Sequence, residues 1–162
     1  MNRIIFFALL VCGFGGIVYS QEQPIKPPIS NNALYVGAGS WIVVSSASLN
    51  YERRLISSSS GKLHLFGRVG AVTGFAFYDG TYVGGTFGTT LLTGKKNSHF
   101  ELSAGVATGS NESLDTERVL NNIRIAYPDV SIGYRYQKPS GGLVFRAHAG
   151  TLGLGIGLGY AF

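Results

Sequence analysis

The side chains that could do chemistry in this chain are charged residues and histidines that alternate with apolar residues. A spacing of two places them on one face of a β-strand and their apolar neighbours on the other. Acidic and basic side chains share this polar face, so the pattern predicts ion pairs between strands. The residues are Glu52, Arg54, His64, Arg68, Glu101, Asp129, Arg135, Arg146 and His148.

Catalysis is not indicated by the histidines. A nucleophile needs an adjacent base and a group that orients the base. His148 is followed by Ala149 and Gly150, so no serine two residues on shares its face. His64 and His99 lie on strands that need not be neighbours. We therefore expect no catalytic residues.

Metal, cofactor and nucleic-acid sites are not indicated either. Three dispersed histidines show no metal-ligand spacing, and the only cysteine, Cys12, lies in the apolar segment at the N-terminus. Gly94-Lys95 is followed by Lys96 where a phosphate-binding loop has serine or threonine. The chain has 13 Lys and Arg against 8 Asp and Glu, but the excess is scattered, so we expect no nucleic-acid partner.

Alternation after residue 32 predicts β-strands separated by polar or glycine-containing turns, with no convincing helix. The facing of the first strand is ambiguous because Gly37, Ala38 and Gly39 blur its pattern. In the sixth strand, Pro128 predicts a bulge or a later start near Asp129. The eight predicted strands cover about residues 34–44, 47–55, 63–75, 82–92, 99–108, 123–137, 143–149 and 152–162.

The last predicted strand, residues 152–162, has large apolar residues on one parity and glycine or alanine on the other. Its apolar face needs either a second sheet or lipid as a partner. Residues 1–20 have the parts of a secretory signal peptide: Arg3, an apolar run and a cleavage site ending at Ser20. The apolar run is shorter than the roughly 20 residues of a spanning helix. Residues 21–32, with three prolines, are predicted to form an extended periplasmic leader.

An even number of strands places the short turns 57–62, 94–97 and 138–142 on the side of the N-terminus, and the long polar stretch 109–122 on the other. This asymmetry is typical of outer-membrane barrels. The aromatic residues also indicate an outer-membrane barrel, because they are predicted to form two girdles, one near each end. One contains Tyr35, Tyr51, Phe100, Tyr134, Tyr136, Phe145, Tyr160 and Phe162, and the other Trp41, Phe75, Phe77, Tyr78 and Tyr82.

Five short motifs lie along the predicted strands and turns: Asn50-Tyr51-Glu52-Arg53, Gly94-Lys95-Lys96, His99-Phe100-Glu101, Gly133-Tyr134-Arg135-Tyr136 and Gly159-Tyr160-Ala161-Phe162. They resemble a family of small outer-membrane β-barrel proteins common in Bacteroidetes, with an eight-stranded barrel of the OmpA/OmpX type. The likeness covers nearly all of residues 33–162 and implies a barrel of usually unassigned function. The terminal aromatic residues, Tyr160 and Phe162, resemble the signal recognised by the barrel-assembly machinery.

The sequence therefore predicts an all-β, eight-stranded antiparallel up-and-down transmembrane barrel over residues 33–162, exported to the outer membrane of a Gram-negative cell. Such a barrel has a lumen that side chains can fill, so we expect a closed lumen and no wide pore. We predict a monomer in outer-membrane lipid with a structural or interaction role. A lipid-modifying outer-membrane enzyme and a soluble lipocalin-like carrier remain alternatives. The predicted lumen charge network comprises Glu52, Arg68, Glu101, Arg135 and Arg146.

Overall fold

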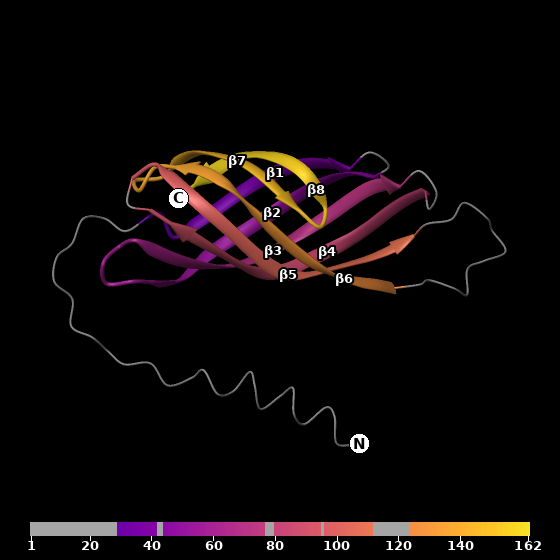
Figure 1. Cartoon of the computed structure of the whole chain (residues 1–162), viewed down its shortest axis with the longest axis horizontal. Helices are drawn as coiled ribbons and strands as arrows, with labels where there is room; N and C mark the ends of the chain where they lie inside the picture. Colours follow the sequence, from indigo (N-terminus) through magenta and orange to yellow (C-terminus); the bar gives the residue numbers. More distant parts are fainter. Residues whose placement is uncertain (1–28, 42–43, 77–79, 95, 112–123) are drawn as a thin grey trace, which may run out of the picture.

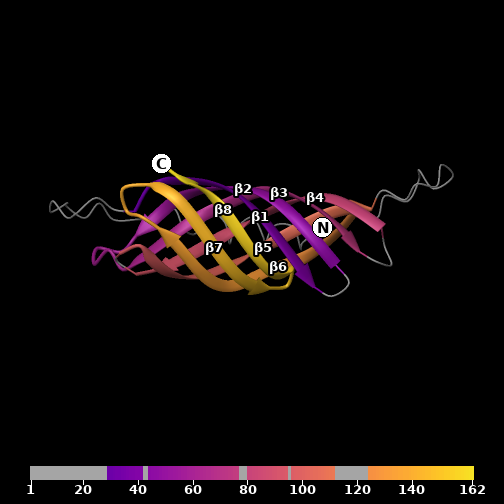
Figure 2. The ribbon, with the colours of Figure 1, turned by 90° about the horizontal axis from the view of Figure 1, so that it is seen from above.

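The computed structural model describes residues 29–41, 44–76, 80–94, 96–111 and 124–162, and shows a closed antiparallel barrel (Figures 1 and 2). Each strand pairs with the next, and β8 pairs with β1. The predicted fold class, an all-β barrel of eight antiparallel strands, is thereby confirmed. The strands are β1 Asn32–Trp41, β2 Val44–Ser57, β3 Leu63–Ala76, β4 Gly80–Thr93, β5 Ser98–Asn111, β6 Arg124–Gln137, β7 Gly142–Gly150 and β8 Gly153–Ala161.

Parts of the predictions lie outside the described residues: the signal peptide, most of the leader, Phe77 and Tyr78, and most of the long polar stretch. Within the described part of the chain, no helix is long and apolar enough to cross a membrane. We call the end where β1 begins and β8 finishes the terminal end, and the opposite end the loop end. Both the N-terminal segment and the C-terminus reach the barrel at the terminal end (Figure 1).

The two parities of each strand face different environments, as the alternation predicts. In β8, Leu154, Ile156 and Leu158 point outward and are more than half exposed, whereas the glycines between them point inward. Small residues are required there, because a Cβ at Gly159 would lie 2.2 Å from the Leu34 carbonyl oxygen. The structure also resolves the facing of β1: Leu34 and its parity face outward and Tyr35 faces the lumen.

The prediction of a bulge or a late start at Pro128 was wrong. β6 begins at Arg124 and pairs with β5 without a register shift, with Pro128 opposite Val106. β7 pairs only with the part of β6 nearer the terminal end, from Ser131 onward. The N–H and the C=O of Val130 both form hydrogen bonds with Thr151 on that side of the strand. Pro128 lies two residues away, so its nitrogen faces the same side. That edge is unpaired at Pro128, and proline is tolerated there because no N–H is needed.

A bulge does occur in β2, where the register with β3 shifts between Arg54 and Ile56. As a result, Leu55 and Ile56 are consecutive in the chain and both exposed. The sequence pattern did not predict this irregularity.

The barrel wall is uneven in height. β7 and β8 have nine residues each, whereas β2 to β6 have 14. With about 3.3 Å per residue and a tilt near 40°, these lengths correspond to heights of about 23 Å and about 35 Å. At the loop end, β3 to β6 project beyond the β7–β8 hairpin (Figure 1).

The terminal end is closed by the segment just before β1. Ile29 is 3% exposed and packs against Phe66 and Leu92, which point into the lumen. The Arg54 guanidinium donates a hydrogen bond to the Ile29 carbonyl oxygen (2.9 Å), and the Ser30 hydroxyl donates to that of Pro139 (3.3 Å). The last residues of the predicted leader therefore form an apolar plug in the barrel.

Candidate functional site: an ion-paired lumen

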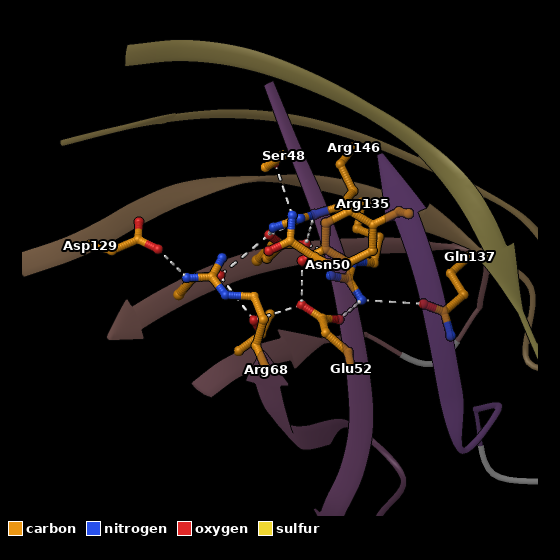
Figure 3. A network of polar contacts seen from close by, with 12 residues as sticks. Ser48, Asn50, Glu52, Arg68, Asp129, Arg135, Gln137 and Arg146 are labelled. Atoms are coloured by element: carbon orange, nitrogen blue, oxygen red, sulfur yellow. Dashed lines mark hydrogen bonds and ion pairs between the residues drawn. The ribbon is translucent and has the colours of Figure 1, made fainter. Parts of the chain in front are cut away.

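Four of the five residues predicted to form the lumen charge network are joined by ion pairs inside the lumen, and three of them, Glu52, Arg135 and Arg146, are labelled in Figure 3. Arg135 lies between two acids: its Nη1 is 2.6 Å from Oε2 of Glu52, and its Nε is 2.6 Å from Oε2 of Glu101. Arg146 donates from Nε to both carboxylate oxygens of Glu101 (3.0 Å) and from Nη2 to Oε1. Closure of the barrel places these side chains of β2, β5, β6 and β7 across the same lumen.

Neutral side chains add further hydrogen bonds to this network. Tyr35 and Thr90 both donate hydroxyl hydrogen bonds to Oε1 of Glu52, at 2.8 and 2.9 Å. The Tyr35 ring also lies against the guanidinium of Arg146, 4.2 Å from its carbon to the ring centroid. At this distance a cation–π interaction contributes about 1–2 kcal/mol in a desolvated site. Tyr35 was not predicted to belong to the network, because the facing of its strand was ambiguous.

Arg68, the fifth predicted member, stands opposite Glu52 in the pairing of β2 with β3, but its side chain bonds to a different acid. It pairs with Asp129, with 2.5 Å between Nη2 and Oδ2, and no hydrogen bond or ion pair joins it to Glu52 or Glu101 among the described residues. Asp129 lies on β6 six residues before Arg135, so this second pair is displaced toward the loop end. Asp129 does share the polar parity from which the network was predicted.

The buried charges balance. Among the described residues, the buried charged side chains are three carboxylates and three arginines, apart from histidines. An unpaired buried ion costs several kcal/mol, so neutrality allows six ionised groups to remain inside a narrow lumen. Glu52 and Arg135 have no exposed surface, so the middle of the lumen is filled by side chains.

Two of the three histidines have hydrogen-bond partners within the described part of the chain. Nδ1 of His64 is 2.9 Å from the Ser57 hydroxyl, and Nε2 of His99 is 3.1 Å from the Gln137 carbonyl oxygen. No carboxylate joins the Ser57–His64 pair through a described hydrogen bond. The described residues also contain no group of three His, Cys, Asp or Glu that could hold a metal.

The aromatic girdles are only partly as predicted. Tyr35 faces the lumen and is 2% exposed, so its place in the girdle was wrong. The Tyr82 hydroxyl lies across the inner face of Gly74, so Tyr82 also points inward. Trp41 and Phe75 face outward at the loop end, and Tyr160 and Phe162 are exposed at the terminal end. The Phe162 backbone exchanges two hydrogen bonds with Asn32, at 2.8 and 2.9 Å.

The geometry defines a small closed barrel with an apolar exterior and a neutral, ion-paired interior. No protein-family model matches the chain, and no curated protein is similar to it. Its function must therefore be inferred from the distribution of apolar and charged side chains.

Proposed function

We propose that this protein is an integral outer-membrane β-barrel with a closed lumen and a structural or interaction role. The observation that carries the proposal is its inverted polarity. Among the described residues, 23 large apolar side chains are more than 40% exposed, whereas the charged network is buried. Every strand contributes to this outer belt, for example through Val36, Leu49, Val69, Phe87, Leu102, Ile132, Leu143 and Ile156.

A belt around the whole barrel is far more than a soluble monomer exposes, since its largest apolar patch is about 300–600 Å². Membrane barrels instead alternate apolar residues toward lipid with polar residues toward the lumen. A lipocalin-like carrier needs the reverse: a polar exterior and a cavity for its ligand. The lumen of this protein is filled at its middle by ion pairs, which disfavours the carrier.

The strand lengths support the same proposal. The β7–β8 hairpin, about 23 Å high, matches an apolar band of about 25 Å. Unpaired backbone groups are costly in hydrocarbon, so the unpaired edge of β6 from Arg124 to Asp129 belongs above that band. The projecting parts of β3 to β6 then stand outside the membrane, and the terminal end with the Ile29 plug faces the periplasm.

The closed lumen favours a scaffold over a pore. The side chains of Glu52 and Arg135 fill the middle of the lumen, and Ile29 with its apolar neighbours fills the terminal end. We therefore propose a monomeric barrel, assembled through its C-terminal strand with Tyr160 and Phe162, that displays its connecting segments outside the cell. The resemblance to small Bacteroidetes outer-membrane barrels is part of this proposal, as are signal-peptide-dependent export and the absence of catalysis.

The test is a charge placed on the outer face. Ile156, 58% exposed midway along β8, is replaced by arginine, and unfolding is measured in lipid vesicles. We expect a loss of about 2–4 kcal/mol, the cost of arginine near the bilayer midplane. Ser59→Arg, in the exposed turn between β2 and β3, is the control and should change stability little. Equal stability of the two variants, or a monodisperse mature protein in plain buffer, would contradict the membrane assignment.

The Ser57–His64 pair is the observation that favours an enzyme as the second candidate. A lipid hydrolase using it should lose activity in Ser57→Ala while keeping its fold. We expect no activity toward phospholipid or lipopolysaccharide acyl chains in either protein. Hydrolysis by the wild type that Ser57→Ala abolishes would establish the enzyme instead.

A further inference from the structure

A small cavity lies in the lumen between the charge network and the loop end. We call it the upper lumen cavity. It is bordered by Arg68, Asp129, Arg146 and His148, together with Ser48 and small residues of β1 and β8. Its volume is about 50 Å³, counted as space open to the centres of water molecules. One water needs roughly 10–15 Å³ by this measure, and drug-sized ligands occupy about 300–1,000 Å³. The cavity can therefore hold a monatomic ion or a few waters, but no sugar or nucleotide.

Two buried nitrogen atoms of residues that border this cavity have no hydrogen-bond partner among the described residues: Nε of Arg68, which is a donor, and Nδ1 of His148, which donates in one of its two tautomers. The Arg68 side chain is 6% exposed, so bulk water does not surround it. A guanidinium has donors and no acceptor, so this Nε–H can be satisfied only by an acceptor such as a water oxygen or an anion. A cation is excluded as its partner.

The charges at the cavity wall favour an anion. Two arginines, Arg68 and Arg146, border the cavity, against a single carboxylate, Asp129. Glu101 binds Arg146 from the network side and does not border the cavity. The Ser48 hydroxyl accepts a hydrogen bond from Asn50, so its own O–H remains available to donate.

We propose that the upper lumen cavity binds a small inorganic anion of the size of chloride. Arg68 supplies the charge and the Nε–H donor, and Ser48 and His148 supply further donors. The proposal depends on the interior of the barrel and not on where the barrel resides, so it can fail while the membrane assignment stands.

The test uses the full chain as a folded barrel, with chloride exchanged for gluconate at constant ionic strength. Gluconate is too large for the cavity, so chloride binding should raise the unfolding midpoint by mass action. Crystals soaked in bromide should show an anomalous peak within hydrogen-bond distance of Nε of Arg68.

Two variants should move chloride affinity in opposite directions. Arg68→Met removes a charged donor and should weaken chloride binding about 10- to 100-fold. Asp129→Asn removes the opposing charge and should tighten it at least about tenfold. Arg53→Met, at an exposed arginine near the terminal end, removes one positive charge as Arg68→Met does and should leave chloride binding unchanged.

If Arg68→Met alone does not fold, the double variant Arg68→Met/Asp129→Asn keeps the lumen neutral and should also lose chloride binding. The proposal is overturned if bromide leaves only water in the cavity. It is equally overturned if chloride stabilises the wild type and the Arg68 variants to the same extent.

Discussion

Replacing Arg135 by methionine should destabilise the barrel strongly, and a second substitution should partly restore it. Arg135 is completely buried between Glu52 and Glu101. Glu101 keeps its ion pair with Arg146 in the variant, but Oε2 of Glu52 loses its hydrogen bond from Arg135. The lumen then carries one uncompensated negative charge, and breaking a buried pair in this way costs about 3–5 kcal/mol.

The second substitution, Glu52→Gln, removes that negative charge. Tyr35 and Thr90 can still donate to the oxygen of the glutamine side chain, since both bond to Oε1 of Glu52 in the wild type. Replacing both members of a buried pair is often nearly neutral. We therefore expect the double variant to recover at least about half of the stability lost in Arg135→Met.

The assay is equilibrium unfolding by urea in lipid vesicles, followed by the fluorescence of Trp41, the only tryptophan in the chain. Arg53→Met, an exposed arginine on β2, is the control and should change stability by no more than about 0.5 kcal/mol. If Glu52→Gln lowers the stability of Arg135→Met further, electrostatic balance does not determine the stability of this lumen, and the reasoning is refuted.

Three more changes test the plug, the last strand and the unpaired edge. Ile29→Ala should cost about 2–4 kcal/mol, because it opens a cavity beside Phe66 and Leu92, and vesicle unfolding measures the loss. Removal of Phe162 should impair membrane assembly more than truncation of any other single surface aromatic, as measured by the folded fraction in cell envelopes; normal insertion would refute that role. Pro128→Ala should leave stability within about 0.5 kcal/mol but add an N–H donor to the unpaired edge of β6, so light scattering should show more self-association.

The neutral interior explains how a polar lumen can coexist with a closed one. Each buried acid has an arginine within hydrogen-bond distance, and the pairs lie at two levels along the barrel. This arrangement leaves the middle of the lumen filled, and two of the unpartnered nitrogen atoms, Nε of Arg68 and Nδ1 of His148, belong to residues that border the upper lumen cavity. The ion pairs at the middle of the lumen therefore contribute to stability, whereas the proposed anion site lies apart from them in the upper lumen cavity.

The sequence by itself determined the number of strands, their order and, for seven of the eight, which parity faces inward. A period of two has only two faces, so apolar and polar residues in strict alternation leave little choice. The same alternation identified the ionisable residues that face the lumen. It was ambiguous where small residues removed the contrast between the faces, as at Gly37 to Gly39, and Tyr35 was consequently placed in the outer girdle.

Only the tertiary structure decided which of the lumen residues are partners. Glu52 and Arg135 are far apart in sequence and on strands that do not pair, so their contact depends on barrel closure and on the register of every strand between them. For the same reason Arg68 meets Asp129 instead of a glutamate, and Ile29 packs against Phe66 and Leu92 at the terminal end. Alternation specifies the face of a side chain, whereas its height and its partner across the lumen follow from the stagger of the closed sheet.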